Sequence, residues 1–193
     1  MSGGSLLMKA LPYDAEVEYL ESSGTQWIDT GYKPNANIKF EISGTQDTTD
    51  SALFGLSYVF YCFDNNNISD TTYYGFCGNT GNFALVMRGI PVVITMSASD
   101  GLVINGTKYA NLTAGSTTAN YSMALFGRRD NNNGVVLKLG RHIIKYTKIY
   151  SGNTLVLDLI PVRIGQIGYM YDKVSKQLFS NSGTGNFILG NDI

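Results

Sequence analysis

The stretch KIYSGNTLVLDLIPVRIGQIGYMYDKVSKQLFSNSGTGNFILG, from Lys148 to Gly190, decides the fold. Gly- and Asn-containing turns interrupt it at short intervals, which predicts a strand, a tight turn, a second strand and then a further hairpin. Its period-two residues are Leu155, Leu157 and Leu159 on one side and Val156, Asp158 and Ile160 on the other. A period of two is the spacing of a β-strand, so the leucine side is expected to face the protein interior.

Alternation and turn residues continue through the rest of the chain. Ile38 to Ser43 alternates apolar and polar residues, which predicts a strand with one solvated face. The run from Ala52 to Phe63 is apolar and aromatic, which favours one strand, or two with a bend near Ser57. Asn105-Gly106 suits both positive-φ positions of a type I′ hairpin turn. Because no long amphipathic helix interrupts this pattern, the sequence predicts an all-β fold, a two-sheet antiparallel jelly-roll sandwich.

Composition limits the class of protein. The 193 residues fit one domain, and a charged fraction of 15% argues against disorder and against a charged helical protein. Twenty-two Gly fit many tight turns, and thirteen Tyr with nine Phe fit strands, because aromatic rings pack well on pleated surfaces. A net charge of -1 gives no electrostatic attraction to nucleic acid or to an anionic membrane, so neither is expected as a partner.

The start of the chain and its cysteines add two expectations. Residues 1–12 are expected to be a flexible lead, and residues 13–193 a single jelly-roll domain. The lead lacks the basic and apolar regions of a secretory signal, and no apolar run reaches the ~20 residues that span a bilayer. Cys62 and Cys77 are too few for a disulfide scaffold and are expected to be buried thiols, with one bridge between neighbouring strands as the alternative.

Several motifs carry a resemblance to a known family. They are YLESSGTQWIDTG (Tyr19 to Gly31), LFG (Leu125 to Gly127) followed by an Asn-rich loop, KIYSGNTLVLDLIPVR (Lys148 to Arg163) and GYMYDKVSKQLFSNSGTGNF (Gly168 to Phe187). Together they resemble the concanavalin A-like (laminin-G-type) jelly rolls of phage, prophage and gut-bacterial surface proteins. The resemblance implies that Glu16 to Thr30 packs near Gly168 to Leu189, and that the protein lies on a virion or a bacterial cell surface.

The resemblance also implies a non-catalytic carbohydrate-binding or adhesion module. Its expected partner is a cell-surface glycan or another virion or surface protein, and a homo-oligomer is compatible with this role. The alternatives are a purely structural or oligomerisation domain of a phage particle and an accessory domain of a glycoside hydrolase. The residues give an enzyme little support, because Glu16, Glu18 and Glu21 lack the central Asp of the glycosidase strand motif. His142 is the only histidine and is expected to be structural or on the surface.

The sequence DNNN occurs twice, at Asp64 to Asn67 and at Asp130 to Asn133, each time after an aromatic-rich strand. Carboxylate and amide oxygens can bond sugar hydroxyls or hold Ca²⁺, so Asp64 and Asp130 are the candidate calcium ligands. No other metal or cofactor is expected. The alternative is that these residues only form Asx turns.

Aromatic and cationic side chains complete the predicted site. A sugar's C–H face can stack on the rings of the cluster Tyr58, Phe60, Tyr61, Tyr73 and Tyr74, with core packing as the alternative. The adjacent Arg128 and Arg129 can pair with an acidic sugar, or they are simply solvated. We expect one loop end of the sandwich to bring these groups together. The predicted ligand-binding residues are Asp64, Asn65, Asn66, Tyr73, Tyr74, Arg128, Arg129, Asp130, Asn131 and Asn132.

Overall fold

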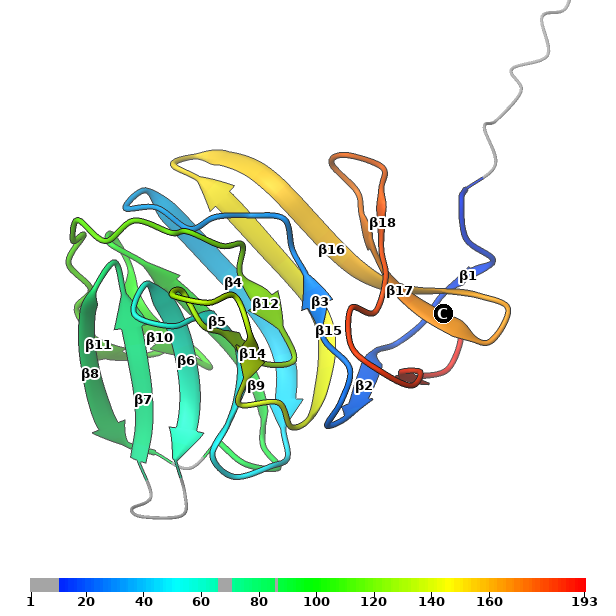
Figure 1. Ribbon diagram of the computed structural model, residues 1–193, viewed down its shortest axis with the longest axis horizontal. Coiled ribbons are helices and arrows are strands. Elements are labelled where there is room, and N and C mark those ends of the chain that lie inside the picture. Colours follow the sequence, from blue (N-terminus) through cyan, green and yellow to red (C-terminus); the bar gives the residue numbers. More distant parts are fainter. Residues whose placement is uncertain (1–10, 66–70, 86) are drawn as a thin grey trace, which may run out of the picture.

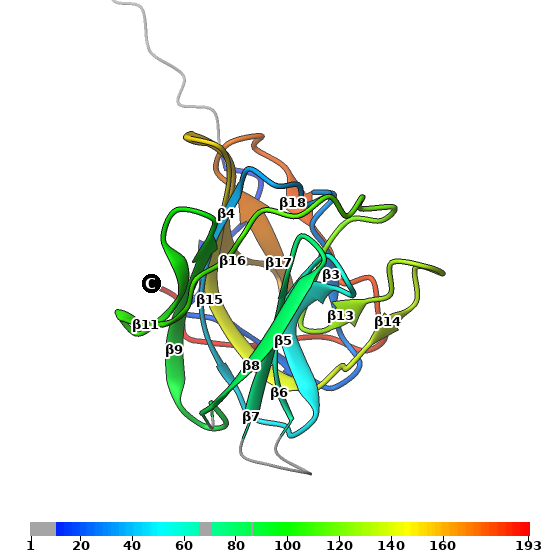
Figure 2. The same cartoon turned by 90° about the vertical axis from the view of Figure 1, so that its left-hand side faces the viewer.

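The computed structural model describes residues 11–65, 71–85 and 87–193, and every regular element in them is a β-strand (Figure 1). The strands form two sheets, of eleven and eight strands, which face each other (Figure 2). The predicted two-sheet antiparallel jelly-roll sandwich is therefore confirmed. Residues 1–10 of the predicted lead lie outside the described residues. Within the described residues, no helix is long and apolar enough to cross a membrane.

The larger sheet has one face on the core and one face in solvent. Its strand order is β11 (Thr107–Ala110), β10 (Gly101–Ile104), β9 (Pro91–Ser97), β4 (Ile38–Gln46), β15 (Arg141–Ser151), β16 (Thr154–Ile164), β17 (Ile167–Asp172) and β18 (Leu178–Phe179). Beside this path, β1 (Ala15–Glu16) pairs with β16, and β2 (Leu20–Ser23) pairs with β15 and β19 (Ile188–Leu189). The predicted alternation in β4 is confirmed, because buried and half-exposed residues follow each other along the strand.

The smaller sheet is formed mainly by the middle of the chain. Its order is β14 (Val136–Leu137), β13 (Arg128–Arg129), β5 (Ser51–Leu56), β6 (Phe60–Asn65), β7 (Thr71–Phe76) and β8 (Asn79–Ala84), and β12 (Ala124–Leu125) links β5 to β3 (Ile28–Asp29). The pairing of β13 with β5 is parallel, whereas the other pairings of this sheet are antiparallel. The run from Ala52 to Phe63 forms two strands joined at residues 57–59, so the predicted bend near Ser57 is confirmed.

Chain direction assigns each connection to one of two ends of the sandwich. The upper end in Figure 1 holds residues 57–59, 77–78, 98–100 and 152–153. The lower end holds residues 47–50, 105–106 and 138–140. These two names are kept below.

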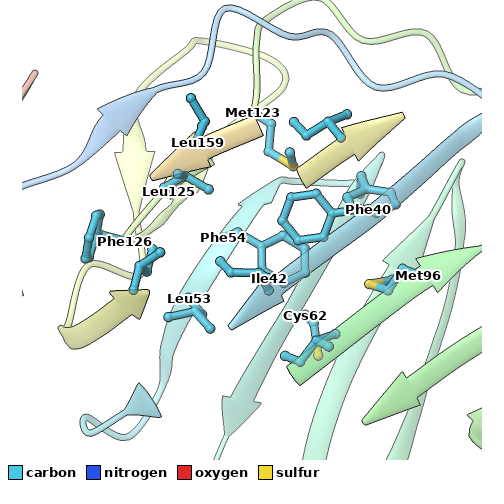
Figure 3. Close-up of a cluster of buried hydrophobic side chains, with 14 of the residues drawn as sticks. Phe40, Ile42, Leu53, Phe54, Cys62, Met96, Met123, Leu125, Phe126 and Leu159 are labelled. Atoms are coloured by element: carbon cyan, nitrogen blue, oxygen red, sulfur yellow. The ribbon is translucent and has the colours of Figure 1, made fainter. Parts of the chain in front are cut away.

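The core lies between the sheets and is rich in phenylalanine (Figure 3). Phe40 of β4 and Phe54 of β5 meet across the sandwich with ring centroids 4.2 Å apart. Leu157, which is 8% exposed, and the fully buried Leu159 face this core as predicted, whereas Leu155 is only half-buried and Val156 packs against the core instead.

Replacing Leu157 with alanine is expected to lower the free energy of unfolding by about 2–5 kcal/mol, because it removes buried methyl groups and leaves a cavity. Chemical denaturation measures the change. Ile160→Ala is the matched control, because Ile160 lies on the half-exposed side of the same strand. A loss below ~1 kcal/mol for Leu157→Ala would show that this side of β16 does not support the core.

The first described strands and the last segment of the chain lie together, as the resemblance implied. Strand β19 pairs with β2, where Ile188 lies opposite Glu21. The backbone amide of Thr184 donates to the carbonyl of Thr25 at 3.2 Å, and that of Ser182 donates to Trp27 at 2.8 Å. These bonds join the first strands to the final loop.

Three local expectations can be checked against the backbone. Asn105 and Gly106 have φ angles of 49° and 80°, which confirms the two positive-φ positions of the β10–β11 hairpin. Asp172 accepts hydrogen bonds from the backbone amides of the turn that follows it. Cys62 and Cys77 are both buried, and neither forms a disulfide.

Candidate functional site

The two DNNN sequences lie at opposite ends of the smaller sheet. Asp64 pairs with Ser51 at the lower end of β5, whereas Arg129 pairs with Leu56 at its upper end. Five residues separate these two positions on β5, which is roughly 16 Å along a strand. The expectation that both sequences share one loop end is therefore wrong.

The first DNNN sequence is only partly described. Asp64 and Asn65 provide the last backbone pairings of β6, opposite Thr72 and Thr71 of β7. Their side chains and Asn66 lie outside the described residues. Ligand or calcium binding there stays a prediction.

The second DNNN sequence forms a turn at the upper end. The carboxylate of Asp130 accepts hydrogen bonds from the backbone amides of Asn132, at 2.7 Å, and Asn133, at 3.1 Å. Asn131 is buried, and its side chain donates to the carbonyl of Thr118 and accepts from the amide of Asn120. This is the Asx-turn alternative, with Asn131 fastening the turn to residues 118–120. Among the described residues, no group of three or more His, Cys, Asp or Glu is placed to hold a metal ion.

Arg129 is held by an extensive set of contacts. Its guanidinium forms an ion pair with Asp29 at 2.7 Å and donates to the hydroxyl of Ser122 and the carbonyl of Gly134, both at 2.9 Å. It also lies 5.7 Å from the ring of Trp27 and 5.1 Å from that of Tyr121, within the range of cation–π attraction. Arg129 therefore joins β3, β13 and the segment before β12.

The Asp29 carboxyl shows the effect of this arrangement. Burial alone would raise its pKa, but hydrogen bonds from Ser122, from the backbone amide of Gly31 and from Arg129 outweigh burial and lower it. Asp29 therefore stays ionised opposite the guanidinium. The ion pair therefore links β3 to β13, and the Arg129 guanidinium is engaged with groups of the protein itself; ligand binding by Arg129 stays a prediction.

Tyr73 and Tyr74 point to opposite faces of β7. Tyr74 packs against the main core, with its ring centroid 6.2 Å from that of Phe83. Tyr73 packs against Tyr61 and Ala52 on the outer face of the smaller sheet. The alternation of a strand makes this unavoidable, so the two tyrosines cannot both belong to one site.

Arg128 joins Tyr73 on this outer face. Because Phe60 and Cys62 of β6 are in the core, Tyr61 between them points outward. The guanidinium of Arg128 lies 5.0 Å from the centre of the Tyr61 ring. Burial is the largest influence on the Tyr61 hydroxyl and raises its pKa. The charge of Arg128 partly offsets this rise, and the nearby Tyr58 adds to it.

We name Tyr58, Tyr61, Tyr73 and Arg128 the tyrosine platform. Gly75 makes it possible, because a Cβ at this position would collide with the Tyr61 ring lying across β7. Tyr58 stands at the upper edge in the 57–59 turn, with 59% of its surface exposed. The platform therefore offers one open ring, two supporting rings and a cation on a rigid sheet.

The acids and the histidine considered for catalysis are separate from the platform. Glu21 is bound by Arg141 at 2.6 Å, Glu18 by Asn191 at 3.0 Å, and Glu16 by the hydroxyl of Tyr13 at 2.9 Å. These three carboxylates thus have three different partners. His142 is fully buried in β15, so the expected structural role is confirmed.

Sequence reasoning missed the partners of Arg129. Trp27 and Asp29 both lie in the quoted motif YLESSGTQWIDTG, but Asp29 is 100 residues from Arg129 along the chain. Tyr121 and Ser122 carry no distinguishing signal in the sequence. Only the pairing of β3 with β12 brings these groups together.

Comparison with known proteins supports the fold and goes no further. No family model matches the sequence, and no curated protein matches it. A solved structure of similar fold is that of a candidate carbohydrate-binding protein from Bacteroides ovatus, with a TM-score of 0.61 and 13% sequence identity over 91% of this chain. The chain spans 61% of that protein's length.

Proposed function

We propose that this protein is a non-catalytic carbohydrate-binding or adhesion module, displayed on a bacterial surface or a phage particle. The observation that carries the proposal is the tyrosine platform on the outer face of the smaller sheet. The distant fold similarity to a candidate carbohydrate-binding protein supports it. The glycan on a cell surface is the proposed partner.

The chemistry of the platform suits a sugar. The apolar C–H face of a pyranose stacks on an aromatic ring, and Tyr58 presents an open ring with a hydroxyl at its tip. The guanidinium of Arg128 places a positive charge beside the Tyr61 ring, which suits an acidic sugar. Because Tyr61 and Tyr73 are packed on the sheet, little side-chain entropy is lost when a ligand binds.

Replacing Tyr58 with asparagine is expected to weaken glycan binding by about tenfold or more, the cost of losing one central aromatic contact. Asparagine suits the position because Tyr58 has a φ of 63°, a conformation that asparagine tolerates. Tyr109→Asn on β11 is the matched control, since Tyr109 is also exposed but lies on the other sheet. Screening on a glycan array followed by isothermal titration calorimetry measures the effect. Equal affinities for the two variants, both with wild-type melting temperature, would reject the platform as the site.

A structural or oligomerisation role is the second candidate. The observation that favours it is a pair of exposed apolar side chains next to the platform, Val135 at 53% and Leu137 at 43%. Leu137 lies opposite Arg128 in the pairing of β13 with β14. If light scattering shows an oligomer that Leu137→Lys dissociates, and the array shows no glycan binding, this role replaces the first.

A further inference from the structure

A polar furrow opens at the upper end of the sandwich. It lies between residues 33–36, which precede β4, and residues 115–119, which precede β12, and it is an open hollow of about 380 Å³. Its polar side chains are those of Lys33, Asn35, Ser116, Thr117 and Thr118.

The furrow continues along the same end toward the larger sheet. A second hollow of about 260 Å³ shares Ala36 with the first. Its polar side chains are those of Asn37, Lys39, Ser97, Ser99 and Asn153. Amides and hydroxyls thus follow each other along the end of the sandwich, and they are groups that both donate to and accept from sugar hydroxyls.

The wall of the first hollow formed by residues 115–119 is fixed to the sandwich. The side-chain amide of Asn131 donates to the carbonyl of Thr118 at 3.0 Å, and that of Asn79 donates to the carbonyl of Thr113 at 3.0 Å. A Cβ at Gly115 would collide with the carbonyl oxygen of Cys77, so the backbone lies directly on the β7–β8 turn. Through Asn131, the second DNNN sequence therefore stabilises the wall of the furrow that contains Thr118.

The tyrosine platform and the furrow meet at the β7–β8 turn. The turn that carries Tyr58 is bonded to it, since the amide of Cys77 donates to the carbonyl of Val59 at 2.5 Å. On the other side of the same turn, Gly78 lies directly against the hydroxyl of Thr117 in the furrow wall. Gly78 is exposed and has no side chain of its own, so at this point only Thr117 lies against the turn that joins the two sites.

We infer that the ligand is an oligosaccharide chain, with one part on the tyrosine platform and the following residues passing over Gly78 and Thr117 into the furrow. This inference rests on the proposed function and adds the length of the ligand to it. The aromatic platform binds by stacking, whereas the furrow binds by hydrogen bonds to hydroxyls. A single terminal sugar reaches only one of the two sites.

The test is calorimetry with glucan, mannan, xylan and galactan oligosaccharides of two and of six residues. Wild-type protein is expected to bind the preferred hexasaccharide at least tenfold more tightly than its disaccharide. The double variant Lys33→Met/Thr118→Val removes polar groups of the furrow and is expected to lose this difference while binding the disaccharide like the wild type. Tyr58→Asn is expected to weaken both lengths.

The matched control is Lys108→Met/Thr107→Val, the same pair of changes at exposed positions of β11. It should bind both lengths like the wild type. If the wild-type protein binds the disaccharide and the hexasaccharide with equal affinity, the inference is wrong and the proposed function stands. The same conclusion follows if the furrow variant binds the hexasaccharide as tightly as the wild type. If the wild-type protein binds neither the disaccharides nor the hexasaccharides, both the inference and the proposed function are rejected.

Discussion

Between pH 6.5 and pH 4.5 the wild-type protein should lose about 2 kcal/mol more unfolding free energy than His142→Gln. His142 lies inside β15 between Ser22 and Gln46 of the neighbouring strands, and neither of its ring nitrogens has a hydrogen-bond partner among the described residues. Burial lowers its pKa from 6.5 to about 3. Below pH 6.5 His142 therefore binds a proton in the unfolded chain but not in the folded protein. The stability that neutral His142 contributes is therefore full about one unit above pH 6.5. Below pH 6.5 the loss approaches about 1.4 kcal/mol per pH unit on the way to pH 3.

Urea denaturation across this pH range measures the difference. His142 is the only histidine in the chain, so the upper part of the range, from pH 6.5 to about 5, contains no other side chain with an ordinary pKa inside it. Gln keeps a similar volume without titrating, and His142→Leu serves as a second variant, because an apolar residue leaves no unsatisfied nitrogen. Parallel pH profiles for the wild type and both variants would show that His142 is not buried in its neutral form.

Replacing Arg129 with methionine should cost about 2–3 kcal/mol of unfolding free energy, since hydrogen bonds to charged groups are each worth more than ~1 kcal/mol and the partial exposure of Asp29 reduces the loss. Methionine keeps the apolar stem against Trp27 and Tyr121 but removes every donor. Asp29 is then left without its cation. Its pKa should rise, because burial is the largest influence on it and would be less fully opposed.

The contribution of the ion pair itself can be separated by a double-mutant cycle with Asp29→Asn. The control is Lys39→Met, which breaks the exposed ion pair of Lys39 with Asp100 and should cost less than about 1 kcal/mol. If Arg129→Met costs no more than the control, Arg129 is free to serve a ligand. Arg129 would then be a second candidate, separate from Arg128, which points to the opposite side of β13.

Local pattern predicted much of the fold because burial of one sheet face forces period-two alternation. The strand from Ile38 and the burial of Leu157 and Leu159 in β16 follow from that rule alone. The Asn105-Gly106 turn and the Asp172 turn follow from backbone conformation and from short polar side chains. Each of these features is decided within a few residues of sequence.

The site depended on long-range geometry that pattern does not contain. The positions of the two DNNN sequences depend on how many strands lie between them, and the long irregular segment before β12 has no periodic signal. Tyr73 belongs with Arg128 because β6 places Tyr61 between them. Local sequence identified useful residues, Tyr73 and Arg128, but combined them with Tyr74 and Asp64, which lie on another face and at another end.

The most direct measurement is a ¹H–¹⁵N NMR titration with the oligosaccharide that the array selects. The proposed function predicts that the largest shifts fall on Tyr58, Tyr61, Gly75 and Arg128, with a second group at residues 115–119 for the longer chain. Shifts confined to the solvated face of the larger sheet, around Glu41 and Lys148, would place the ligand elsewhere. No shift with any oligosaccharide of the panel would contradict carbohydrate binding itself.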